Sequence, residues 1–320
     1  MENLPYQLVV IDHTTRALLL VDNSGEIIAQ ISYPAGCTPT ELVLAPDQIT
    51  VYLPIIDASD NGGLFIANLK QQSIYRLPMK LPQPIQFTLS PDGIYAYLAD
   101  PAGMLYSLTI NTMSLKSWGT PAKACCVGLS SDRMAVYGVW EHGSGGSLAA
   151  FSLTGELLIE HTLPGIPTNI TLDNEGHILI PFTTSTFTIE GVICFNRVLN
   201  QDHTLAILPS QRCIYPYSTS PSAAYPSHIA TCSNEHIAYV VNEENDSITV
   251  IDSHTAAIIR HIKLGRSISC LHILPGAQFG IGTSHILGDL SLIDLHNGRL
   301  LSVTDTKREL LGYIAVLPTL

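Results

Sequence analysis

The sequence predicts an all-β protein built from repeated sheet units, and three observations support this prediction. Residues 239–265 contain three short β-rich runs, 239–241, 248–251 and 258–264, separated by polar turns. Weaker copies of this three-strand pattern recur along the chain. Apolar residues make up 46% of the sequence but fall in short runs, none approaching the ~18 residues that span a bilayer. A soluble protein of short, buried strands with no membrane span is therefore expected.

The repeats can be aligned on one residue, usually proline, that precedes a turn resembling Ser-Pro-Asp-Gly in each unit. These leading residues are Pro39, Pro84, Pro121, Pro167, Pro226 and Ser267. They are separated by 45, 37, 46, 59 and 41 residues. A period of about 40–45 residues with four strands per unit is typical of a β-propeller blade.

The register gives six internal units, and a seventh is split between the two ends of the chain. Residues 6–11, 17–21 and 26–31 supply three of its strands, and 312–320 supply the fourth. We therefore predict a single domain over residues 1–320, a seven-bladed β-propeller of four-stranded blades. The C-terminal strand completes the N-terminal blade as its innermost strand, which removes the open sheet edges. The expected blades are 1–33 with 312–320, 39–80, 84–118, 121–163, 167–209, 226–265 and 267–305.

One unit resembles the YVTN-type β-propeller repeat, a WD-like repeat of short strands. The match begins at residues 239–242, where Tyr-Val-Val-Asn stands for Tyr-Val-Thr-Asn. It continues with Val-Ile-Asp at 250–252 and closes with Ile-Lys-Leu-Gly at 262–265. Members of that family range from surface-layer proteins to enzyme subunits. The resemblance thus implies the propeller fold and does not single out an activity.

Charge and cysteine content narrow the classes of partner and compartment. The net charge is −12 and the 15 Lys and Arg residues are scattered, which disfavours nucleic-acid binding. Seven cysteines show no CxxC pair, and Met1 is not followed by a charged-then-apolar leader, so a cytoplasmic protein is expected. A secreted protein whose leader has been removed is the alternative. The twelve histidines show no His-x-His or HExxH arrangement, and we expect no metal and no cofactor.

Alignment of the predicted innermost strands places one polar residue per blade near the mouth of the central channel. This set, here named the channel column, is Glu41, Gln86, Cys126, Asn169, His228, Cys270 and Tyr313. The next residue is apolar in every blade. The candidate ligand-binding residues are Glu41, Gln86, Asn169, His228 and Tyr313. The alternative is that these side chains are polar only because they hydrate the channel.

A long connection precedes Pro226 and is the second candidate site. It contains Tyr215, Tyr217 and Tyr225, which are costly to leave free in solvent. Long connections in compact folds are often functional, so a lid or partner-docking loop over the channel mouth is one interpretation. A packed connection without a function is the other.

The leading functional hypothesis is a non-enzymatic binding or scaffold propeller that engages a protein, peptide or small molecule at the channel-mouth face. The sequence shows no concentrated acid–base or metal cluster, and it leaves open whether the protein is an enzyme. The alternative is a hydrolase similar to the propellers of the lactonase superfamily. There Glu41 would be the general base, His228 would assist, and Asn169 would polarise a carbonyl. A further alternative is a subunit of a redox enzyme complex.

Overall fold

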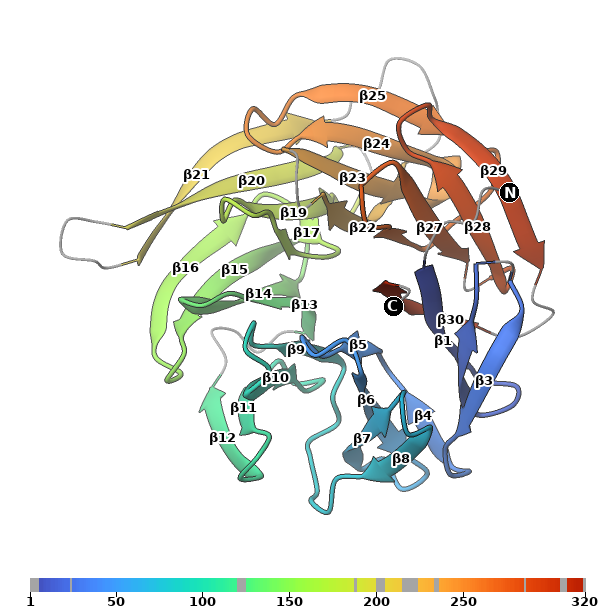
Figure 1. Cartoon of the computed structure of the whole chain (residues 1–320). Helices are drawn as coiled ribbons and strands as arrows, with labels where there is room; N and C mark the ends of the chain where they lie inside the picture. Colours follow the sequence, from blue (N-terminus) through green and yellow to red (C-terminus); the bar gives the residue numbers. More distant parts are fainter. Residues whose placement is uncertain are drawn as a thin grey trace.

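The structure is a computed structural model that describes residues 6–23, 25–119, 125–186, 189–199, 205–214, 224–232, 236–284, 286–305 and 310–318. It confirms the predicted fold class. Seven antiparallel sheets, the blades, stand around a central axis, and each sheet runs from that axis to the rim of the ring (Figure 1).

The first four blades follow one another around the ring. Blade 1 consists of β30 (Leu310–Pro318), β1 (Tyr6–Asp12), β2 (Ala17–Val21) and β3 (Ile27–Ser32). Blade 2 consists of β4 (Cys37–Pro39) with β5 (Val43–Leu44), then β6 (Thr50–Asp57), β7 (Gly62–Asn68) and β8 (Ser73–Arg76). Blade 3 consists of β9 (Gln86–Leu89), β10 (Tyr95–Ala99), β11 (Leu105–Thr109) and β12 (Ser114–Gly119). Blade 4 consists of β13 (Cys125–Ser131), β14 (Ala135–His142), β15 (Gly145–Ser152) and β16 (Leu157–Leu163).

The remaining three blades complete the ring. Blade 5 consists of β17 (Ile166–Pro167) with β18 (Thr171–Leu172), then β19 (Ile178–Thr183), β20 (Glu190–Leu199) and β21 (Leu205–Ile214). Blade 6 consists of β22 (Pro226–Thr231), β23 (Ile237–Asn242), β24 (Ser247–Asp252) and β25 (Ile258–Lys263). Blade 7 consists of β26 (Cys270–Ile273), β27 (Phe279–Ser284), β28 (Asp289–Asp294) and β29 (Arg299–Asp305). The helix η2 (Glu243–Asn245) has three residues, and the described part of the chain contains no helix long and apolar enough to cross a bilayer.

The strands are apolar on both faces because each blade packs between two others. In β1, Val9 and Ile11 face blade 2, whereas Leu8 and Val10 face blade 7. The hydrophobic core therefore divides into seven clusters, one at each contact between adjacent blades. The outermost strands have no such neighbour beyond them, and β29 alternates between exposed and half-buried residues.

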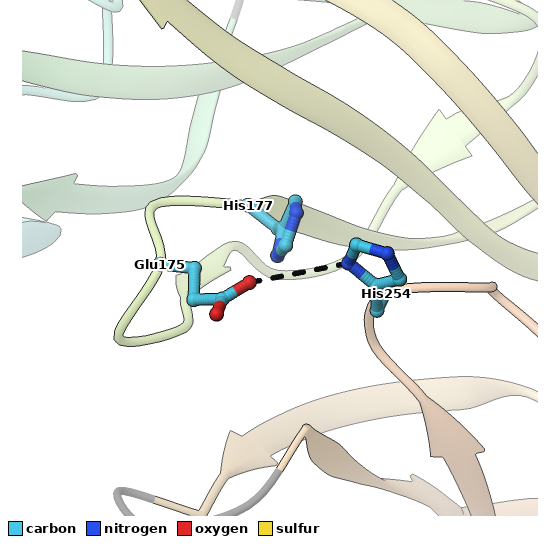
Figure 2. A group of neighbouring side chains, drawn as sticks. All are labelled: Glu175, His177 and His254. Carbon is cyan, nitrogen blue, oxygen red and sulfur yellow. Dashed lines mark ion pairs between the residues drawn. The ribbon is translucent and has the colours of Figure 1, made fainter.

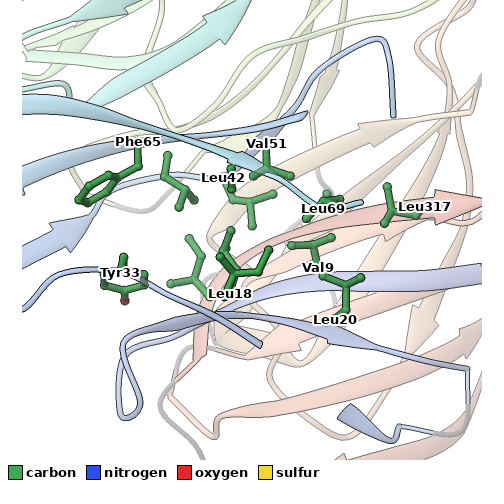
Figure 3. Close-up of a cluster of buried hydrophobic side chains, with 14 of the residues drawn as sticks. Val9, Leu18, Leu20, Tyr33, Leu42, Val51, Phe65, Leu69 and Leu317 are labelled. Atoms are coloured by element: carbon green, nitrogen blue, oxygen red, sulfur yellow. The ribbon is translucent and has the colours of Figure 1, made fainter. Parts of the chain in front are cut away.

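The cluster between blades 1 and 2 shows how the ring is closed (Figure 3). Leu317 of β30 and Val9 of β1 belong to the same cluster as Leu42 and Val51 of blade 2. β30 pairs antiparallel with β1 along its length, with Val10 opposite Ile314. The predicted closure by the C-terminal strand is thus confirmed, and the two ends of the chain share one sheet.

Blade 5 differs from the other units in its outer strands. β20 and β21 have ten residues each. β21 continues beyond residue 209, which is the last residue of this blade in the alignment of the repeats. The sequence predicts an extra short strand over residues 204–208. That segment is instead the first half of the fourth strand, paired with β20. The longer connection before blade 6 therefore begins beyond Ile214.

Candidate functional site

Four of the seven residues of the channel column lie where an innermost strand is irregular. Glu41 lies in the gap between β4 and β5, and Asn169 lies in the corresponding gap between β17 and β18. His228 follows a β-bulge in β22, and Cys126 precedes one in β13. A bulge or gap turns a side chain out of the regular alternation of its strand. These irregularities let column side chains reach across to the neighbouring blade.

Glu41 and His228 make the same kind of contact in different blades. The Phe87 N–H of blade 3 donates to Glu41 Oε2 at 2.9 Å. The Leu271 N–H of blade 7 donates to His228 Nδ1 at 3.4 Å. Phe87 and Leu271 occupy equivalent positions, each directly after the column residue of its blade. Both side chains therefore satisfy a backbone donor of the next blade, which is a structural role that the sequence did not reveal.

Threonines beside the column tie the same strands together. The Thr40 hydroxyl donates to the Pro84 carbonyl of blade 3 at 2.8 Å, and the Thr168 hydroxyl donates to the Pro226 carbonyl of blade 6. Each proline lies two residues before the column residue of its own blade. The Pro-Thr pairs at 39–40 and 167–168 thus hold adjacent blades in register at the channel.

The other predicted residues are placed as follows. Gln86 begins β9 and is half-buried, and Asn169 Oδ1 accepts the Ile170 N–H at 2.7 Å. Tyr313 belongs to β30, but its side chain lies outside the described residues, as do Tyr215 and Tyr217. Tyr225 is half-buried and has a positive φ of 49°. No contact between any two of the predicted ligand-binding side chains is found among those that the structure describes.

Burial leaves Glu41 and His228 uncharged near neutral pH. Burial raises the pKa of Glu41 to about 8, although the hydrogen bond from the Phe87 N–H acts in the opposite direction. Burial lowers the pKa of His228 to about 4. Part of the surface of each residue nevertheless remains accessible, and His228 lines the cavity described next. Burial raises the pKa of the Cys126 and Cys270 thiols to about 12.

A cavity of about 390 Å³ lies among the innermost strands of four consecutive blades. Its lining comes from residues 42–44, 228, 230–231, 271–273 and 314–316. Most of these side chains are aliphatic. The polar groups are His228, Thr231 and His272, and the two imidazole rings are 6.1 Å apart between centroids. The lining of the cavity is therefore mixed: its side chains are mostly aliphatic, and polar atoms also face the space.

Sequence reasoning missed His272, although the signal was present. Side chains alternate along a strand, so the residue two positions after a column residue faces the same way. His272 stands two positions after Cys270, and Ala230 two positions after His228. Both line the cavity. The two-residue period of a strand therefore predicts a second set of channel-facing residues, two positions after the channel column.

Buried Glu190 anchors the end of the long connection. It begins β20 and is 1% exposed. Its carboxylate accepts the N–H groups of Ala224 at 2.7 Å and Tyr225 at 3.1 Å, and the Thr183 hydroxyl donates to it at 3.3 Å. The chain is therefore fixed where it enters blade 6. These hydrogen bonds lie on the face of the ring that carries the turns between the second and third strands of each blade. The predicted lid belongs to the same face.

Replacing Glu190 with alanine is expected to lower the free energy of unfolding by about 2–5 kcal/mol, since each buried donor left without an acceptor costs about 1–3 kcal/mol. Urea denaturation measures the change. Glu190→Gln keeps one carbonyl acceptor and should lower the free energy of unfolding by a smaller amount. Glu160→Ala, on the exposed face of β16, is the matched control. Equal stability of the Glu190→Ala and Glu160→Ala variants would contradict the anchoring role.

Side chains with metal-binding chemistry gather away from the channel. Glu175, His177 and His254 lie close together on turns of blades 5 and 6. The sequence predicts no metal site, because its histidines are dispersed along the chain. Their proximity arises from the packing of two blades.

The chain resembles solved structures of other propellers. No protein-family model and no curated protein matches it. A periplasmic gluconolactonase from Pseudomonas aeruginosa is 12% identical, with a TM-score of 0.74 over 98% of this chain and 99% of that one. A functionally unknown protein from Desulfotomaculum acetoxidans is 11% identical, with a TM-score of 0.72 over 97% and 98%. A virginiamycin B lyase from Staphylococcus aureus is 16% identical, with a TM-score of 0.63 over 84% of each chain.

Identities this low show the fold alone, because one fold serves many functions. The predicted seven-bladed propeller is thus supported by the comparisons as well as by the sheet order. No family model supports the YVTN-type resemblance of residues 239–265, which rests on those residues. Their three predicted strands are present as β23, β24 and β25.

Proposed function

We propose that this protein is a non-enzymatic binding propeller whose channel cavity takes an uncharged, largely apolar group. That group is a small molecule or a side chain presented by a peptide or protein partner. The observation behind the proposal is the cavity among blades 1, 2, 6 and 7, whose lining side chains are aliphatic except for His228, Thr231 and His272. Pockets of this kind orient a ligand through a few polar contacts and bind it by apolar burial.

The electrostatics of the site favour an uncharged ligand. His228 is neutral at pH 7 because burial lowers its pKa to about 4. Glu41 is mainly protonated at pH 7 because burial raises its pKa to about 8. A charged ligand would lose its hydration without gaining an opposite charge from these two groups, which is costly.

The same features argue against the hydrolase alternative. A general base must be ionised and free to accept a proton from water. Glu41 is mainly protonated at neutral pH, and its Oε2 already accepts the Phe87 N–H. The redox-complex alternative has no described group that favours it.

We place the protein in a reducing compartment, the cytoplasm. Cys37, Cys125, Cys126 and Cys270 are free thiols, and Cys125 is exposed. Exposed thiols persist where glutathione keeps cysteine reduced. The YVTN-type resemblance is retained as a proposal about ancestry, supported by the strand pattern of residues 239–265.

A thermal-shift screen tests the proposed function. Uncharged aromatic and aliphatic fragments are compared with carboxylate and amine analogues of the same shape. We expect the uncharged members to raise the melting temperature. Ala230→Leu should abolish that shift by filling the cavity, while Ala102→Leu, on an exposed turn, should not. Stronger binding of charged analogues, or retained binding in Ala230→Leu, would contradict the proposal. Lactone hydrolysis that is lost in Glu41→Gln would support the hydrolase alternative.

A further inference from the structure

A cluster of one carboxylate and three imidazoles lies at the contact between blades 5 and 6. Glu175 and His177 come from the turn between β18 and β19, and His254 comes from the turn between β24 and β25 (Figure 2). His236 precedes β23. All these turns lie at the end of the ring opposite the predicted lid, since they join first strands to second and third strands to fourth. None of the four residues of the cluster lines the cavity among blades 1, 2, 6 and 7.

Backbone contacts fix the turns that present these side chains. Asp173 Oδ1 accepts the N–H groups of Glu175 at 3.0 Å and His177 at 2.8 Å. Asp252 Oδ1 accepts the His254 N–H at 2.9 Å. Such Asx turns hold the local backbone in one conformation. Two rigid turns from neighbouring blades thus bring their side chains to the same place.

The side chains converge without bonding one another. The ligand atoms of Glu175, His177 and His254 all lie within 4.8 Å of each other. Glu175 Oε2 is 3.9 Å from His254 Nδ1, and Glu175 Oε1 is 3.7 Å from His236 Nε2. Both distances exceed a hydrogen bond. Ligand atoms around a tetrahedral zinc ion, with bonds of about 2.0–2.1 Å, are about 3.4 Å apart. The pairs of Glu175 with His254 and with His236 are within about 0.5 Å of that spacing, and other pairs of the cluster, up to 4.8 Å apart, need shifts of up to about 1.4 Å.

His177 has the second contact that metal-binding histidines usually have. Its Nδ1 lies 2.7 Å from Asp173 Oδ2, and the Ser253 hydroxyl donates to the same oxygen at 2.7 Å. Asp173 and Ser253 are buried, at 9% and 1% exposed. The carboxylate holds the Nδ1 proton of His177 and leaves Nε2 as the free ligand atom. His177 is itself buried, at 9% exposed, so this contact both satisfies the ring and fixes its orientation.

We propose that Glu175, His177, His254 and His236 bind a divalent transition-metal ion, with zinc the ion that this donor set fits best. Three imidazoles and one carboxylate suit zinc, whereas calcium and magnesium take oxygen ligands. Four protein ligands close the coordination sphere, as in structural zinc sites. Because the ligands come from two blades, the ion joins blade 5 to blade 6.

Zinc titration of the full chain, stripped with chelator and then dialysed, tests this site. Isothermal titration calorimetry is expected to show one ion per chain, and added zinc to raise the melting temperature. Cobalt should give the visible absorption of a tetrahedral ion. Glu175→Gln and His254→Ala, both on exposed turns, should weaken zinc binding by at least about 100-fold, more than the 10–100-fold typical of losing an outer contact. His142→Ala, on an exposed hairpin, is the matched control and should bind zinc like the wild type.

Each outcome bears on the proposal. Absence of saturable binding in the wild type, or wild-type affinity in Glu175→Gln and His254→Ala, would overturn it. Wild-type affinity in His236→Ala would overturn the four-ligand arrangement. Fragment binding in the channel should be the same with and without zinc, so failure of this site and failure of the proposed function can be told apart.

Discussion

A chain that ends after Asp305 and so lacks β30 is expected to lose the folded ring. β30 supplies the innermost strand of blade 1 and buries Ile314, Ala315 and Leu317. Losing a single buried Ile or Leu side chain costs about 2–5 kcal/mol. Losing two of them with a whole strand approaches the total stability of a domain, about 5–15 kcal/mol. Urea denaturation followed by circular dichroism, with size-exclusion chromatography, would show the loss of a cooperative transition and aggregation through the exposed edge of β1.

A circular permutant separates this effect from simple loss of sequence. Joining Leu320 to Met1 and opening the chain between residues 305 and 306 keeps every strand and moves β30 ahead of β1. Because β30 pairs antiparallel with β1, the two can form a hairpin. We expect the permutant to fold and to unfold cooperatively. A truncated chain that stays monomeric with wild-type stability would show that the ring does not depend on β30.

Glu41→Gln is expected to stabilise the protein at alkaline pH. Burial raises the pKa of Glu41 in the folded state from 4.5 to about 8. The unfolded chain releases this proton near the lower value, so stability is lost as the pH rises from about 4.5 through 8. A shift of this size corresponds to at most about 5 kcal/mol, at ~1.4 kcal/mol per pKa unit. Gln has no proton to lose and keeps an acceptor for the Phe87 N–H.

Urea midpoints of wild type and Glu41→Gln, measured from pH 5 to pH 8.5, check this expectation. The two should be similar at pH 5 and should separate as the pH rises. His228 acts in the opposite direction, because burial lowers its pKa to about 4 and its contribution is lost as the pH falls from about 6.5 through that value. Glu160→Gln removes a carboxylate from the exposed strand β16 and serves as the control. Parallel loss of stability in wild type and Glu41→Gln would contradict the raised pKa.

The fold was predictable because the signals that specify it are local and repeated. A strand buried between two blades must be apolar on both faces, and runs such as Ala17–Val21 show this directly. The turns after the innermost strands of blades 2 to 5 each carry an aspartate, which is Asp47, Asp92, Asp132 or Asp173. Even ring closure followed from counting strands, since three at the N-terminus need a fourth. Blade 5 departed from the register because its outer strands are longer, which the period does not encode.

The sequence suggested candidate site residues but not their contacts. Of Glu41 and His228 in the channel column, His228 lines the cavity among the innermost strands. Their partners are backbone groups 46 and 43 residues further along the chain, and no repeat pattern reveals which side chain meets which amide. The cluster at the contact of blades 5 and 6 shows the same limit. Glu175 and His177 share a turn in the sequence, but His254 joins them only after two blades pack.

The way Glu41 and His228 are used explains the chemical variety of the channel column. At Glu41 and His228 an interrupted or bulged strand turns the side chain toward an amide of the next blade, and that amide requires only an acceptor. A carboxyl and an imidazole are interchangeable for this purpose. Exchange of one hydrogen-bond acceptor for another at these channel-column positions therefore costs little stability. Residues that resemble a catalytic set can accumulate there without selection for catalysis.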